Sequence, residues 1–110
     1  MKFTALNKKN HFEDLKNEGF CFTEKGLRVF AKLNSETISR LGVSVSSKDA
    51  NAVSRNKFKR RIKEVARGLD QKEHIDILVI ANKQAARLNF QEIHDVFEKH
   101  PRSEEHTSEL

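Results

Sequence analysis

The spacing of apolar residues along the chain changes period several times, and each change predicts a new element. The clearest strand signal has Leu41, Val43 and Val45 alternating with Gly42, Ser44 and Ser46, which is typical of a half-buried strand. The IDILVIA run is almost continuously apolar, as in a central strand. The predicted elements are a helix at 9–18, strands or a hairpin within 20–33, a strand at 38–47, a helix from about 51 to 69, a strand at 75–81 and a helix at about 89–99.

The order of these elements, αβββαβα, indicates one mixed sheet with helices, an α+β sandwich. The strand, helix and strand between residues 38 and 81 would by default cross over right-handedly. We assign residues 1–101 to a single domain. Residues 102–110 have no apolar periodicity, follow Pro101 and look like the translation of a sequencing adapter, so we leave them out of the fold as an artefact or a disordered acidic tail.

Composition narrows the class of protein. No stretch approaches 18 consecutive apolar residues and the N-terminus lacks an apolar signal-peptide core, so we expect no membrane association, no export by a signal peptide, and a cytoplasmic location. The single cysteine, Cys21, cannot form an internal disulfide, and no CxxC or HExxH motif is present, so we expect no structural zinc.

The positive charge is concentrated in one predicted helix. Residues 55–67 hold seven basic side chains and one acidic side chain, whereas the rest of the chain sums to −1. On a helical wheel the apolar arc predicted to pack on the sheet is Phe58, Ile62, Val65, Ala66 and Leu69. The opposite arc is Asn56, Lys59, Arg60, Lys63 and Arg67. Like charges at this spacing repel one another, so the pattern favours a polyanion as the partner of this face.

Catalysis by side chains is not indicated. The five histidines are dispersed, and the acidic pairs are adjacent in sequence, so their members point in different directions. Asp76 is predicted to accept hydrogen bonds at a strand end and Cys21 to be a small strand residue. We therefore assign no catalytic residue and no metal ligand.

Residues 40–64, RLGVSVSSKDANAVSRNKFKRRIKE, resemble the hallmark of the bacterial ribonuclease P protein family. The resemblance implies a mixed four-stranded sheet with about three helices, and a left-handed βαβ crossover in place of the default hand. It also implies a subunit of a ribonucleoprotein in which a catalytic RNA removes the 5′ leader from precursor tRNA. The RNA subunit would hold the catalytic Mg²⁺, and both RNAs would be partners, with no obligatory protein partner.

The resemblance also assigns residues to two surfaces. The RNA-binding residues are Arg55, Asn56, Lys57, Lys59, Arg60 and Lys63, to which the helical wheel adds Arg67. The cleft for the single-stranded leader contains Phe12, Arg28, Phe30, Ser44 and Ser46. The chain departs from the family pattern at Lys16, where a second aromatic is usual, at Arg28, where an apolar residue is common, and at Ala50, which replaces a glycine.

Three other functions remain open from the sequence. A general module for structured RNA would share the basic helix but would not prefer a precursor tRNA over mature tRNA. A helix that docks into a protein of the calmodulin type is disfavoured, because its single apolar arc is needed for the core. A nuclease that acts without RNA ranks last, because no carboxylates or histidines converge.

Overall fold

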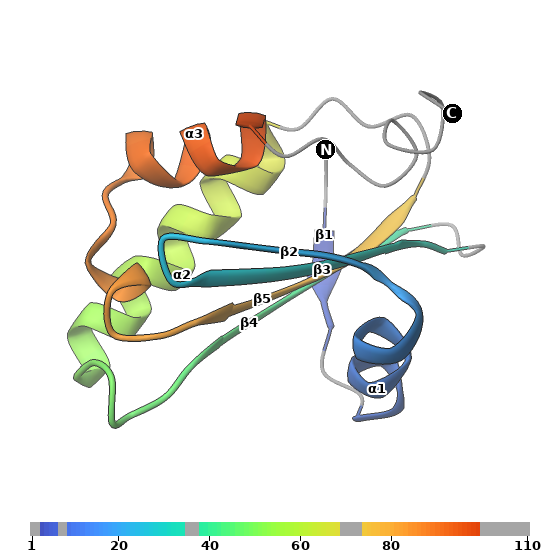
Figure 1. Cartoon of the computed structure of the whole chain (residues 1–110), viewed down its shortest axis with the longest axis horizontal. Coiled ribbons are helices and arrows are strands. Elements are labelled where there is room, and N and C mark those ends of the chain that lie inside the picture. Colours follow the sequence, from blue (N-terminus) through green and yellow to red (C-terminus); the bar gives the residue numbers. More distant parts are fainter. Residues whose placement is uncertain (1–2, 7–8, 35–37, 69–73, 100–110) are drawn as a thin grey trace.

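The computed structural model describes residues 3–6, 9–34, 38–68 and 74–99, which form one sheet with helices on both faces (Figure 1). This confirms the predicted α+β architecture. Within the described residues the elements are β1 (Phe3–Ala5), α1 (Lys9–Glu18), β2 (Phe20–Glu24), β3 (Leu27–Leu33), β4 (Ser39–Val45), α2 (Ala52–Arg67), β5 (Ile75–Ala81), the 3-10 turn η1 (Ala85–Arg87) and α3 (Phe90–Lys99).

Within the described residues the sheet has five strands in the order β1-β4-β5-β3-β2, one more than the four predicted. The missed strand, β1, pairs in parallel with β4. It is only three residues long and only Phe3 among them is partly buried with a large side chain, so it gives almost no periodic signal. β4 and β5 are parallel and are joined through α2, which confirms the βαβ unit. The left-handedness of this crossover remains a prediction from the family resemblance.

A tight turn joins the two antiparallel strands β2 and β3, where the alternation predicted a hairpin. Its two loop residues, Lys25 (φ 52°) and Gly26 (φ 84°), both lie in the left-handed region. Two-residue hairpin loops favour this backbone because it matches the twist of the strands. A side chain on Gly26 would collide with Asn82, since a Cβ there would lie 2.2 Å from Oδ1 of Asn82.

The main core lies between the sheet and the layer formed by α2 and α3 (Figure 1). Phe58 and Ile62 of α2 are completely buried, against side chains from β3, β4 and β5 that alternate toward this face. Val65 and Ala66 are buried beside them. Four of the five residues in the predicted apolar arc are therefore core residues, and the fifth, Leu69, lies outside the described residues.

A smaller core lies on the opposite face of the sheet, where α1 packs on β3 and β5. Leu15 of α1 is buried there with Leu6, Phe30 and Leu78, and Phe12 is half buried at the margin. The sheet is thus covered on both faces, but α1 is short and covers only part of its side.

The loop before α2 ends in a well-formed helix cap. Asn51 is the N-cap, and its Oδ1 accepts a hydrogen bond of 2.8 Å from the backbone N–H of Ser54. Gly68 is the C-cap of the helix. Ala50 does not need the backbone conformation of the usual glycine, because Lys25 is the only non-glycine described residue with positive φ. The predicted tail, 102–110, lies outside the described residues.

Candidate RNA-binding site

The exposed face of α2 carries most of the residues predicted to bind RNA. Asn56, Lys57, Arg60, Lys63 and Arg67 are exposed, and Lys59 is half buried. Among the described residues, Lys57, Lys59, Arg60 and Lys63 take part in no ion pair, whereas Arg67 Nη1 lies 2.8 Å from Oε1 of Glu64. The helix therefore presents four cations that no described carboxylate neutralises.

Two other arginines of α2 are tied to backbone carbonyls. Nη1 of Arg55 donates to the Ala50 carbonyl at 2.9 Å, which closes the loop before the helix. Nη1 of Arg61 donates to the Leu88 carbonyl at 3.2 Å and so fastens α2 to the segment before α3. Arg55 was predicted to bind RNA, and its guanidinium retains further donors for that role. Neither carbonyl bond is visible in the sequence, because both depend on how loops pack.

The five residues predicted for the leader cleft reach one face of the sheet, the face that α1 partly covers. In the register of the strands Ser44 lies beside Ile80, and Ile80 beside Arg28. Ser44 and Arg28 are exposed and Ile80 is half buried, so α1 leaves this row open. Ser46, just past the end of β4, is also exposed.

The next row along the same face lies under α1 and holds the two predicted aromatics. Phe30 pairs with Leu78, which pairs with Gly42, and Phe12 of α1 lies over Gly42, where a Cβ would be 3.2 Å from Cε1 of Phe12. Phe30 is only 7% exposed and belongs to the smaller core. Phe30 is therefore a core residue beneath this face, and Phe12 is the more exposed of the two aromatics.

A polar cluster that the sequence did not predict anchors α1 to the sheet. Arg40 and Asp76 form a two-point ion pair, with Nε to Oδ1 and Nη2 to Oδ2 both at 2.8 Å, and the side chains are 19% and 11% exposed. Asn34 donates to Oδ1 of Asp76 at 2.6 Å. Nη1 of Arg40 lies 3.1 Å from Nε2 of His11 on α1. The expectation that Asp76 accepts hydrogen bonds at a strand end is confirmed; its partners are 36 and 42 positions away and leave no local signal.

This cluster lines a hollow of about 270 Å³ beside α1. Lys32 of β3, which also lines this hollow, forms an ion pair with Glu18 at the end of α1. The hydrogen bond from Lys32, supported by its charge, lowers the pKa of Glu18, and the same bond raises the pKa of Lys32. Both side chains are largely exposed, so the pair contributes little to stability.

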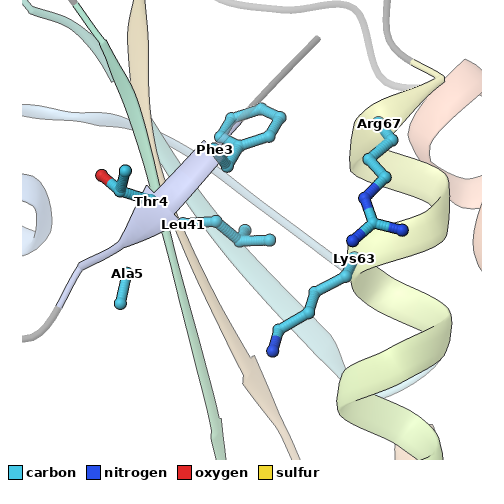
Figure 2. Close-up of a pocket in the computed structure, with 6 residues that line it drawn as sticks. All are labelled: Phe3, Thr4, Ala5, Leu41, Lys63 and Arg67. Carbon is cyan, nitrogen blue, oxygen red and sulfur yellow. The ribbon is translucent and has the colours of Figure 1, made fainter.

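A second hollow, of about 220 Å³, lies between β1 and the C-terminal half of α2 (Figure 2). Phe3 and Leu41 point from the sheet toward the helix, and Lys63 and Arg67 point from the helix into the same space. The sequence predicted both cations as RNA-binding residues, but not the pocket, since β1 was missed.

Two further features bear on the chemistry of the chain. Within residues 3–6, 9–34, 38–68 and 74–99, no three His, Cys, Asp or Glu side chains are grouped so that they could hold a metal ion. None of the helices in those ranges is long and apolar enough to cross a membrane.

Fold and surface together define a small α+β protein whose second helix carries four cations that pair with no described carboxylate. Comparison with known proteins identifies the family. The model of the family Ribonuclease P matches residues 1–103. The chain belongs to the ribonuclease P protein family, whose members are components of a ribonucleoprotein of tRNA processing.

Relatives of known sequence and structure agree. The ribonuclease P protein component of Clostridium botulinum is 34% identical over 96 residues, which are 84% of this chain and 86% of that protein. That of Streptococcus pneumoniae is 32% identical over 90 residues, 80% of this chain and 73% of the relative. The RNase P protein of Staphylococcus aureus superposes with a TM-score of 0.73 at 32% identity, covering 89% of this chain and 92% of that one. The protein from Thermotoga maritima gives 0.69 at 25% identity, covering 88% and 97%.

Proposed function

We propose that this chain is the protein subunit that assists the catalytic RNA of ribonuclease P in removing the 5′ leader from precursor tRNA. The observation that carries the proposal is the exposed face of α2, where Lys57, Lys59, Arg60 and Lys63 have no ion-pair partner among the described residues. Such a face is self-repulsive in the free protein. A polyphosphate backbone relieves that repulsion and releases counterions on binding.

The RNA subunit is the partner that fits α2. If each of these four cations contacts a phosphate, the slope of log K against log salt is about −2.8 to −3.6, at roughly 0.7 to 0.9 per contact. Mixed lysine and arginine suits RNA, because arginine can bind a phosphate at two points or stack on a base, whereas lysine acts as a mobile point charge. Arg55 and Arg61, which donate to backbone carbonyls, tie α2 to the loop before it and to the segment before α3.

The single-stranded leader fits the opposite face of the sheet. Exposed Arg28 is available for a phosphate, and Ser44 and Ser46 leave room for a sugar–phosphate backbone to approach. The half-buried ring of Phe12 offers a surface on which an unpaired base can stack without sequence preference. Lys16 takes the place of the second aromatic usual in the family, so we expect this chain to hold the leader through fewer stacked bases.

In this proposal the RNA subunit catalyses the cleavage reaction. No described cluster of acidic or histidine side chains fits Mg²⁺, so the catalytic Mg²⁺ is assigned to the RNA subunit, as the family resemblance implies. The protein reduces the repulsion between two RNAs, and therefore lowers the Mg²⁺ concentration that cleavage needs. Because tRNA is matured where it is made, we expect the complex to act in the cytoplasm.

The test is cleavage of precursor tRNA by a bacterial ribonuclease P RNA at low Mg²⁺, with and without this protein. We expect strong stimulation, and a higher affinity of the complex for precursor tRNA than for mature tRNA. Absence of stimulation would refute the proposal. Tight binding of the RNA subunit with equal affinity for precursor and mature tRNA would instead identify a general module for structured RNA.

A further inference from the structure

The pocket between β1 and α2 combines features that a simple phosphate contact does not need. Its six lining residues are Phe3, Thr4, Ala5, Leu41, Lys63 and Arg67. One wall is apolar, formed by the ring of Phe3 and the side chain of Leu41, and the facing wall is the two cations (Figure 2). At about 220 Å³ the hollow is smaller than pockets for drug-sized ligands. It suits one flat group with one charged group attached.

The cations of this pocket differ in their surroundings. Lys63 is exposed and takes part in no ion pair among the described residues, whereas Arg67 is paired with Glu64 at 2.8 Å. Since Arg67 and Glu64 are themselves in solvent, this pair is weak and can yield to a stronger anion. The pocket therefore retains a net positive charge next to an apolar wall.

The edge of the sheet adds hydrogen-bonding groups. β1 is the outermost strand on this side, and the backbone N–H of Leu6 donates to the Leu41 carbonyl at 3.0 Å. Because N–H and C=O groups of successive residues in a strand face opposite edges, those of Ala5 face outward, away from β4. Among the described residues no hydrogen bond to this outward edge is formed. A donor and an acceptor therefore stand beside the pocket, as the edge of a nucleobase requires.

We propose that this pocket binds one unpaired nucleotide of the RNA that docks on α2. The base lies against Phe3 and Leu41, its polar edge meets the outward backbone of Ala5, and its phosphate lies between Lys63 and Arg67. This inference rests on the proposed function and adds to it a base-binding site on the α2 side of the sheet. It also gives the short strand β1 a role that its contribution to the fold does not explain.

Fluorescence provides a direct test, because the chain contains no Trp and no Tyr. Phe3→Trp puts a single fluorophore in the apolar wall of the pocket, and a stacked base quenches indole emission. A matched reporter, Phe90→Trp on α3, replaces an aromatic that lines no part of the pocket. We expect a bacterial ribonuclease P RNA to quench Trp at position 3 at least about twofold and Trp at position 90 little.

Small probes separate the base from the phosphate. Adenosine 5′-monophosphate should quench the Phe3→Trp protein, and inorganic phosphate should not. Lys63→Gln in that background should weaken the nucleotide response, while Lys83→Gln, which removes the same charge outside the pocket, should leave it unchanged. Equal responses to phosphate and nucleotide would show an anion site only and would overturn the proposal.

Affinity supplies a second measurement that does not depend on a reporter. Phe3→Leu preserves an apolar side chain for packing but removes the aromatic face, so it should weaken RNA binding about 5- to 10-fold with little change in melting temperature. Tight RNA binding with unquenched Trp at position 3 would overturn the pocket and leave the proposed function standing. Failure of the unmodified protein to bind the RNA at all would refute both.

Discussion

Adjacent arginines on α2 allow the RNA-binding role of its exposed face to be tested with a matched pair of variants. Arg60 is exposed and has no ion-pair partner among the described residues, whereas Arg61, one position on, is half buried and donates to the Leu88 carbonyl. Arg60→Gln and Arg61→Gln remove the same charge from the same helix. Only the first removes a group that is free to meet a phosphate.

The structure sets the size of the expected effect. If the four cations each contact a phosphate, each contact adds roughly 0.7 to 0.9 to the steepness of log K against log salt. RNA binding should therefore weaken about 50- to 150-fold between 50 and 200 mM salt. Losing the contact of Arg60 should make this salt-induced loss of affinity about threefold smaller. It should also reduce the steepness of log K against log salt by about one. Arg61→Gln should leave the slope unchanged and lower the free energy of unfolding by about 1–2 kcal/mol through its lost hydrogen bond.

The assay is equilibrium binding to a ribonuclease P RNA at several salt concentrations, together with thermal unfolding of each free variant. Equal slope changes in the two variants would mean that net charge alone drives binding. An unchanged slope for Arg60→Gln would remove the outward face of α2 from the interface. Either result would refute the role given to that face.

Three further predictions concern the supports of the two surfaces. Asp76→Ala leaves Arg40 without its counter-ion and should lower the free energy of unfolding by about 3 kcal/mol, measured by denaturant unfolding; a loss below about 1 kcal/mol would contradict the buried ion pair. Gly42→Ala places a Cβ 3.0 Å from the Leu6 carbonyl oxygen and 3.2 Å from the ring of Phe12. By displacing that ring it should reduce the preference for precursor over mature tRNA about fivefold. Affinity for the RNA subunit is its control, and an equal loss there would point to misfolding. Asn51→Ala removes the cap of α2 and should destabilise the protein by about 1 kcal/mol, with Asn51→Ser as the control that retains a capping oxygen.

Local patterns in the sequence were enough to predict the elements that carry the proposed binding surfaces. The 3.6-residue period of α2 separates Phe58 and Ile62, which are fully buried, from Arg60 and Lys63, which are exposed. The two-residue period of β4 likewise places Ser44 in solvent. In both cases a residue and its neighbours at one fixed spacing determine the outcome, so no tertiary information is needed.

The parts that could not be predicted all depend on contacts between distant segments. Because Phe30 alternates with core residues along its strand, the sequence predicts that its ring faces away from the main core and is exposed. In the structure α1 packs on that face and buries the ring. β1 is identified by its parallel partner β4 and not by its own three residues. The pairing of Arg40 with Asp76 joins two strands that the chain connects only through α2.

The position of β5 in the sheet also has a consequence for biosynthesis. β5 is the central strand and lies between β4 and β3, yet it is the last of the described strands to be made. A nascent chain that ends before Ile75 can form only two separate strand pairs, β1 with β4 and β2 with β3, and neither half of the sheet can join the other. The emerging polypeptide therefore carries two strand pairs with unpaired backbone edges until Ala81 has left the ribosome. The RNA docking proposed for α2 would then follow translation of nearly the whole domain.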